Sequence, residues 1–166
     1  MITVKPFSHE HLGGALSVIL PIQQEEFSIP ITIDEQSDLL DIPGFYQTGK
    51  GNFWAAVADD KVVGTVALLD IGNDTAALPK MFVKADFRGQ RRGVASSLLN
   101  ALLSWSATKN IASIFLGTTE KLHAAHRFYQ KNGFIEIPKS ALPEKFPVMN
   151  VDTKVFKRAL AAGRTP

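Results

Sequence analysis

Cysteine is absent from all 166 residues of the chain. This absence excludes a disulfide framework, a thiolate nucleophile and a thiolate zinc site. It leaves the redox compartment open, since a chain without thiols is compatible with a reducing or an oxidising one.

Long apolar runs are also missing. The longest uninterrupted run covers residues 53–58, far short of the roughly 18 residues that a membrane-spanning helix needs. Residues 1–6 lack the apolar segment of a signal peptide. We therefore expect a cytoplasmic protein that has no membrane partner.

Neither sign of charge dominates. The 18 Lys and Arg residues stand against 16 Asp and Glu residues, which leaves a net charge of +2. Such a balance gives no argument from bulk charge for a nucleic-acid partner. Any phosphate binding must depend on a local group of residues.

The composition is that of an ordinary globular protein, with 45% hydrophobic and 20% charged residues. The length fits one domain, and no internal repeat or linker-like stretch divides it. We expect a single domain over residues 1–166, in which residues 161–166 form a frayed tail.

Hydrophobic periodicity and turn residues predict the order of the helices and strands. The predicted strands cover residues 2–7, 53–58, 62–69, 78–83, 114–116, 134–137 and 148–156. The predicted helices cover residues 9–20, 34–40, 94–109 and 122–132. Consecutive strands favour antiparallel pairing, and strand–helix–strand units favour parallel pairing. The pattern therefore indicates an α/β (α+β) fold with a mixed sheet and helices on both faces.

The segment Arg88-Gly89-Gln90-Arg91-Arg92-Gly93-Val94-Ala95 lies between a predicted strand and the start of the clearest helix. The first turn of a helix has backbone N–H groups without partners and a positive dipole end, which together attract phosphate. The three arginines add positive charge at the same place. A solvated basic turn is the alternative interpretation.

A second informative segment runs over residues 126–134, where Tyr129 precedes Gly133 at the predicted end of a helix. On its own, this segment is equally consistent with aromatic residues of the core.

Together, and in this order, the two segments resemble the GNAT family of N-acetyltransferases. In that family the pattern Gln/Arg-x-x-Gly-x-Gly/Ala opens the helix that holds the diphosphate of acetyl-CoA. The residues Gln90-Arg91-Arg92-Gly93-Val94-Ala95 match it at each fixed position.

The resemblance implies a single, mostly antiparallel sheet with a central parallel strand pair that is splayed for acyl-CoA. The strand at 78–83 would diverge from the strand at 114–116 and hold the pantetheine arm through its backbone. The residues implied in coenzyme binding are Met81, Phe82, Val83, Arg88, Gly89, Gln90, Arg91, Arg92, Gly93, Val94 and Ala95.

The resemblance also implies a role for Tyr129 as the general acid that protonates the departing thiolate. A thiol and a phenol have ordinary pKa values of about 8.5 and 10, so this proton transfer is not badly mismatched. No metal is implied.

The general base stays open. Many members of the family have a Glu on or beside the strand at 78–83, where this chain offers Lys80 and Met81. Other candidates are Glu25, Glu26, Asp70 and His123, each of which could equally be an exposed or structural residue. His123 or Thr118 could also replace an Asn that many relatives use to contact the coenzyme.

The implied activity is transfer of an acetyl group from acetyl-CoA to a primary amine, by direct attack in a ternary complex. Without cysteine there is no cysteine acyl-enzyme. The alternative is a catalytically silent CoA-binding sensor or interaction module. The resemblance allows a homodimer.

The acceptor is a small-molecule or peptide amine whose identity the residues leave open. Residues 22–46, where acceptor-binding elements lie in the family, carry six carboxylates and no Lys or Arg. These carboxylates belong to Glu25, Glu26, Asp34, Glu35, Asp38 and Asp41. They favour a cationic amine, although surface acidity explains them equally well.

Two further patterns are weak. Residues 44–51 fit the first seven positions of a phosphate-binding P-loop, but Gly51 stands where Ser or Thr is needed, and a strand follows instead of a helix. His123 and His126 share a predicted helix, yet no third metal ligand accompanies them at a known spacing.

Overall fold

The computed structural model describes residues 1–89, 91–120, 122–149 and 152–160. Within these residues one sheet has the strand order β1-β2-β3-β4-β6-β8-β7, and β5 pairs separately with β3. The strands are β1 (Ile2–Pro6), β2 (Asn52–Ala58), β3 (Lys61–Gly72), β4 (Thr75–Ala77), β5 (Phe82–Val83), β6 (Ser113–Thr118), β7 (Ile135–Ile137) and β8 (Lys154–Ala159).

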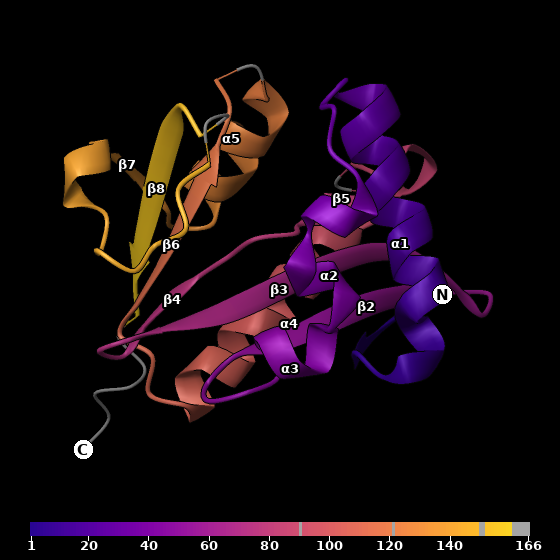
Figure 1. The fold of residues 1–166 in the computed structure, drawn as a ribbon, viewed down its shortest axis with the longest axis horizontal. Helices are drawn as coiled ribbons and strands as arrows, with labels where there is room; N and C mark the ends of the chain where they lie inside the picture. The colour runs from indigo at the N-terminus through magenta and orange to yellow at the C-terminus, as the bar shows by residue number, and fades with distance from the viewer. Residues whose placement is uncertain (90, 121, 150–151, 161–166) are drawn as a thin grey trace.

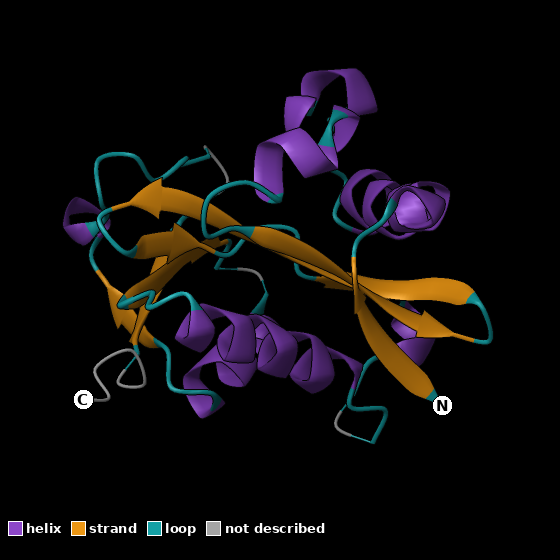
Figure 2. Ribbon diagram, turned by 90° about the horizontal axis from the view of Figure 1, so that it is seen from below, coloured by secondary structure: helices purple, strands orange, loops and turns teal. Residues whose placement is uncertain are grey.

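Helices lie on both faces of this sheet (Figure 2). They are α1 (Leu12–Pro21), α2 (Ser37–Leu40), α3 (Ile42–Tyr46), α4 (Val94–Thr108) and α5 (His123–Lys131). On one face, Leu98 and Leu102 of α4 are fully buried in the main core, which they share with strand residues such as Val66. On the other face, Ile19 of α1 packs in a second cluster with Phe53 of β2.

The predicted fold class is confirmed. The strands β4 and β6 pair in parallel, whereas every other pairing in the described residues is antiparallel. The parallel pair lies in the middle of the sheet order, with α4 between its two strands in the sequence.

The predicted hairpin is confirmed as β2 and β3, which are joined by Asp59 and Asp60. Both residues have positive φ values, 50° and 63°, as a two-residue turn of type I′ requires. The strand β3 continues further than predicted, to Gly72.

The single strand predicted at residues 78–83 is wrong. The strand β4 ends before this range, at Ala77, and within the range only Phe82–Val83 form a strand, β5. Pro79 has no N–H to donate to a sheet, and Lys80 has a φ of 58°, in the left-handed region. Met81 therefore lies outside both strands.

The break ends the pairing with β6, whereas the pairing with β3 continues on both sides of it, through β4 and then β5. The last hydrogen bond to β6 runs from the Leu78 N–H to the Phe115 carbonyl, at 2.9 Å. Beyond it, the Pro79 carbonyl accepts from the Ala67 N–H of β3 at 3.1 Å. Since β6 continues along β8 instead, the two parallel strands splay apart, and Figure 1 shows β6 and β8 diverging from β3.

The segment between α1 and β2 differs most from the prediction. The helical backbone passes through Pro21 into a π-helical turn, Ile22–Glu26, instead of ending before the proline. The helix α3 was not predicted, since Pro43 and Gly44 suggested a loop. The proline occupies the first turn, where no N–H is needed, and the Asp41 carboxylate accepts from the Gly44 N–H at 3.0 Å.

The later helices agree with their predicted ranges. The helix α4 covers Val94–Thr108, and α5 covers His123–Lys131 with Gly133 at a φ of 88° just after it. The last strand starts at Lys154 instead of residue 148, since the described residues 148, 149, 152 and 153 belong to no strand. None of the described helices is long and apolar enough to cross a membrane.

Two neighbouring glycines of α1 should respond oppositely to the same substitution. A Cβ on Gly13 would meet no atom within 4 Å, whereas one on Gly14 would lie 2.6 Å from Cγ2 and 2.8 Å from Cβ of Val62. We expect Gly13→Ala to stabilise the protein by about 0.5–1 kcal/mol. Gly14→Ala should destabilise it by about 1–3 kcal/mol, because α1 must move off β3.

Urea unfolding of both variants measures the two free energies directly. Gly13→Ala serves as the control for the propensity gain that both substitutions share. Shifts of the same sign would contradict the close packing of α1 on β3.

Candidate functional site

The turn before α4 is built on two glycines with positive φ. Gly89 has a φ of 101° and Gly93 a φ of 67°. The Gly89 carbonyl accepts from the N–H groups of Arg92 and Gly93, at 3.2 and 3.3 Å. This arrangement directs the chain into α4, for which Gly93 is the N-cap.

The N-terminus of α4 is open to an anion. A Cβ on either Gly89 or Gly93 would meet no atom within 4 Å, and the cap has no side-chain hydrogen bond. The first helical bond runs from the Ser97 N–H to the Gly93 carbonyl, so the helix geometry leaves the N–H groups of residues 94–96 without intrahelical partners. Such a terminus suits a phosphate group.

The residues of this turn that were predicted to bind the coenzyme differ in how far they are buried. Val94 is fully buried and Ala95 is half-buried, while Arg91 and Arg92 are exposed. The Arg92 guanidinium lies 5.2 Å from the centre of the Phe87 ring. Gln90 lies outside the described residues.

Arg88 is bound within the protein. Its guanidinium makes a bidentate ion pair with the Glu26 carboxylate, with both N–O distances at 2.6 Å. Its Nε donates to the Val83 carbonyl at 2.8 Å. Arg88 therefore joins the end of β5 to the π-helical turn, which was not expected from its place in the basic segment.

The edge of β5 faces the space from which β6 has departed. Phe82 and Val83 pair with Thr65 and Gly64 of β3, and the Lys84 N–H donates to the Val63 carbonyl at 2.9 Å. Because the bonds of a strand alternate in direction, the Val83 N–H points away from β3. It is a backbone donor toward the splay.

Tyr129 lies on α5 and is 7% exposed. Its ring packs against Phe134 and Phe156, at centroid distances of 5.6 and 6.3 Å. Burial raises the pKa of its phenol well above the ordinary value, so the hydroxyl keeps its proton at neutral pH. No described residue forms a hydrogen bond with this hydroxyl.

Several of the alternative polar residues have structural contacts. Asp70 accepts from the N–H groups of Lys50 and Gly72, both at 2.9 Å. Glu26 is paired with Arg88. His123 is exposed at the first position of α5, and Thr118 is 9% exposed on β6.

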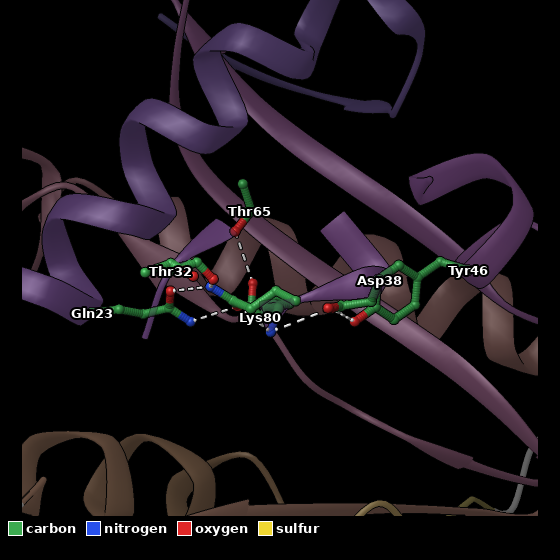
Figure 3. A network of polar contacts seen from close by, with 7 residues as sticks. Gln23, Thr32, Asp38, Tyr46, Thr65 and Lys80 are labelled. Carbon is green, nitrogen blue, oxygen red and sulfur yellow. Dashed lines mark hydrogen bonds and ion pairs between the residues drawn. The ribbon is translucent and has the colours of Figure 1, made fainter. Parts of the chain in front are cut away.

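A polar network that the sequence did not reveal lies beside the break between β4 and β5 (Figure 3). The Lys80 ammonium lies 3.2 Å from Oδ2 of Asp38 and donates to Oε1 of Gln36 at 3.0 Å. The Tyr46 hydroxyl donates to the same Asp38 oxygen at 2.5 Å. Burial and the neighbouring carboxylate raise the pKa of Tyr46 well above its ordinary value, so it stays a donor.

The contacts in the structure weaken the argument that the acidic residues at 22–46 bind a cationic acceptor. Asp38 is neutralised by Lys80, and Glu26 by Arg88. Glu35 and Asp41 cap short helices through hydrogen bonds to backbone N–H groups. With four of the six carboxylates engaged in this way, their number no longer favours a cationic acceptor.

The other two patterns found in the sequence carry no site. Residues 44–51 run from α3 into β2, the reverse of the strand-to-helix order of a P-loop. His126 is buried, and its Nε2 lies 2.9 Å from the Thr119 carbonyl. In the described part of the chain no group of three or more His, Asp or Glu residues is placed to hold a metal ion.

Comparisons with known proteins agree with this architecture. The pattern of the acetyltransferase (GNAT) family matches residues 16–134. Human N-acetylaspartate synthetase is 38% identical over 100 residues, which are 59% of this chain and 32% of that protein. The chain thus corresponds to about a third of the length of that relative.

Solved structures match over nearly the whole chain. A GNAT-family acetyltransferase from Staphylococcus aureus Mu50 superposes with a TM-score of 0.90 at 34% identity, covering 96% of this chain and 99% of that one. An N-acetyltransferase from Thermoplasma acidophilum, solved with coenzyme A, has a TM-score of 0.71 at 17% identity and covers 96% and 99% of the two chains. The second likeness shows the fold alone.

The Glu26–Arg88 pair should give the stability a characteristic pH dependence. The hydrogen bond from Arg88 lowers the pKa of Glu26, so its stabilising effect is present above the unfolded value of about 4.3 and is lost as the pH falls through the folded value. Because the two side chains are 38% and 37% exposed, we expect Glu26→Gln to cost only about 0.5–1 kcal/mol at pH 6.

Chemical unfolding between pH 6 and pH 3 should show this cost shrinking toward zero. Glu25→Gln, which removes the same charge one position earlier, is the matched control and should show no such change. A cost for Glu26→Gln that is constant over this range would contradict the pairing.

Proposed function

The chain belongs to the acetyltransferase (GNAT) family, and from this premise we propose that it transfers an acetyl group from acetyl-CoA to a primary amine. The observation that carries the proposal is the open N-terminus of α4 behind Gly89 and Gly93. A diphosphate placed there would accept from the unpaired N–H groups of Val94 and Ala95 and interact favourably with the helix dipole.

The other coenzyme contacts follow the same strand-to-helix path. We assign the pantetheine arm to the backbone of Met81, Phe82 and Val83 and the diphosphate to residues 89–95, including Gln90. The exposed Arg91 and Arg92 supply positive charge near the phosphates. Arg88 contributes indirectly, because its ion pair with Glu26 and its hydrogen bond to the Val83 carbonyl hold the end of β5 in place.

Acetyl-CoA supplies an activated acetyl thioester to this site. The Val83 N–H is the donor that this chain offers to the thioester carbonyl oxygen, where negative charge develops during attack. In this proposal the acceptor nitrogen attacks the carbonyl carbon directly, and the absence of cysteine excludes a cysteine acyl-enzyme. Alignment of the two substrates in one ternary complex is then the main source of the rate enhancement.

Tyr129 is the general acid in this proposal. As the carbon–sulfur bond breaks, its hydroxyl donates a proton to the sulfur, and the phenolate is reprotonated by the proton that the amine loses. Burial keeps the phenol protonated before the reaction, which ensures that the donor is present throughout the neutral pH range.

A small molecule is the acceptor class that the relatives support. The name of the human relative specifies aspartate as the amine that is acetylated, and we propose an amine of comparable size for this chain. No metal takes part. A single domain over residues 1–166, a cytoplasmic location and a homodimer stay predictions.

The coenzyme site can be tested by placing a carboxylate where the diphosphate should lie. We expect Gly93→Glu to weaken binding of acetyl-CoA by about 3 kcal/mol, a factor of more than 100, through charge repulsion and loss of N–H contacts. Isothermal titration calorimetry with acetyl-CoA, CoA and ATP measures the affinities.

Gly72→Glu is the matched control for this substitution. Gly72 also has a positive φ, 86°, and a Cβ there would meet no atom within 4 Å, but it is the last residue of β3, before the turn to β4. It should carry the same backbone strain without affecting affinity. Equal affinities of the wild type and Gly93→Glu would contradict binding of the diphosphate at the N-terminus of α4.

The role of Tyr129 can be tested by Tyr129→Phe, which removes only the hydroxyl. We expect kcat to fall by about 100-fold, while the Kd for acetyl-CoA stays unchanged because the packing of the ring is retained. Steady-state kinetics and calorimetry provide the two readouts. An unchanged kcat would refute the role of Tyr129 as the general acid. If the wild type binds CoA but acetylates no amine, the alternative of a catalytically silent CoA-binding sensor would be supported instead.

A further inference from the structure

The ion pair between Lys80 and Asp38 lies at the mouth of the splay. Lys80 belongs to the break between β4 and β5, two residues before Phe82, and Asp38 belongs to α2. Figure 3 shows the Lys80 side chain between Gln23 and Thr32 on one side and Asp38 and Tyr46 on the other. The pair therefore adjoins the backbone to which the thioester is assigned.

Burial of this pair is not explained by stability. The side chains of Lys80 and Asp38 are only 11% and 14% exposed. Desolvation of two such charges offsets most of their attraction, so an apolar pair of similar volume would serve the core equally well. The pair calls for another role.

The backbone of Lys80 supports the same view. Its φ of 58° is unfavourable for a residue with a Cβ. Glycine would adopt this conformation without strain, so a turn alone would not require lysine. We therefore infer that lysine occupies this position because of its ammonium group.

Each member of the pair retains one binding position. Oδ2 of Asp38 is ion-paired with Lys80 and accepts from Tyr46, whereas the described residues provide no partner for Oδ1. No described side-chain polar atom is both buried and unpartnered, so Oδ1 reaches solvent. The Lys80 ammonium, which has three protons, donates to Gln36 and forms an ion pair with Asp38, so at least one proton is left for a ligand.

The neighbouring groups hold this arrangement in one orientation. Gln36 is 3% exposed, and its side-chain amide exchanges two hydrogen bonds with Gln23, at 3.1 and 2.9 Å. The Thr65 hydroxyl donates to the Lys80 carbonyl at 2.8 Å. The contacts therefore present one donor and one acceptor of opposite charge side by side.

We propose that Lys80 and Asp38 form the acceptor subsite and that the acceptor is a free α-amino acid, whose carboxylate binds Lys80 and whose amino group is oriented by Oδ1 of Asp38. The amine nitrogen and carboxyl carbon of an amino acid are roughly 2.5 Å apart, close to the 3.2 Å between the two charged groups. The amino acid can thus lie beside the pair in antiparallel orientation, with each of its charged groups next to the residue of opposite charge. This inference rests on the proposed acetyl transfer and adds the class of its acceptor.

The same pair disfavours other amines. A zwitterion adds no net charge to a site that is already neutral, whereas a polyamine places a second cation beside the Lys80 ammonium. A peptide N-terminus or an amino amide offers no carboxylate to Lys80. The subsite therefore selects by the presence of the carboxylate on the carbon that carries the amine.

The test compares the standard L-amino acids, except cysteine, whose own thiol would interfere, with their α-amides as acceptors. Release of free CoA thiol from acetyl-CoA reports the reaction, and the protein itself contributes no thiol because it lacks cysteine. We expect the wild type to use at least one amino acid with a kcat/KM that is 10-fold or more above that of its amide, in line with about 10–100-fold for a hydrogen bond between charged groups. Equal use of acids and amides would overturn the proposal without any variant.

Lys80→Met then assigns the selectivity to this residue. We expect its KM for the preferred amino acid to rise by about 10–100-fold, with kcat/KM for the amide and the Kd for CoA unchanged within about twofold. Lys50→Met is the matched control, because Lys50 is also ion-paired, with Asp74, but lies outside the site. Parallel losses for the acid and the amide would show a structural role and overturn the proposal.

The failure of this inference can be told from failure of the proposed function. Acetylation of amines without a carboxylate, with amino acids inert, would overturn only the acceptor assignment. Absence of CoA binding in calorimetry, with no thiol release from any acceptor, would overturn both.

Discussion

The loss of pairing with β6 at Pro79 and Lys80, while pairing with β3 continues, is the constraint on which the site depends. Up to Leu78 the chain is bonded to β3 on one side and to β6 on the other, and from Pro79 onward the pairing with β3 continues while the pairing with β6 has ended. A proline without an N–H and a residue of positive φ make this change possible. The splay, the free edge of β5 and the position of the Lys80 side chain all follow from it.

The two halves of the proposed coenzyme site are coupled through short stretches of chain. From the free edge of β5, the chain needs only one short helical turn, Ala85–Phe87, before it reaches Gly89 and α4. Arg88 stabilises this connection by binding both the Val83 carbonyl and Glu26. A thioester and a diphosphate can thus be held by one continuous segment, largely through backbone groups that side-chain substitution does not remove.

Ion pairs formed in the folded chain determine which charged residues are available to bind a ligand. The acidic residues at 22–46 and the arginines at 88–92 are obvious groups of like charge in the sequence. In the folded chain Glu26 neutralises Arg88 and Lys80 neutralises Asp38, which leaves the exposed Arg91 and Arg92 as the positive charge of the turn before α4. The Lys80–Asp38 pair of the proposed acceptor subsite is balanced in charge, which suits a zwitterion better than an ion of one sign.

The sequence by itself determined the features that depend on neighbouring residues. These include the Asp59–Asp60 hairpin, α4 with its glycine turn, α5 ending before Gly133, and the mixed sheet. Only the tertiary structure decided the break at Lys80, the helix α3, and the Arg88–Glu26 and Lys80–Asp38 pairs. Arg88 and Glu26 are 62 positions apart, and no periodicity or capping rule acts over such a distance. Ion pairs of this kind form only when packing of α1, α2 and α3 on the sheet brings their partners together.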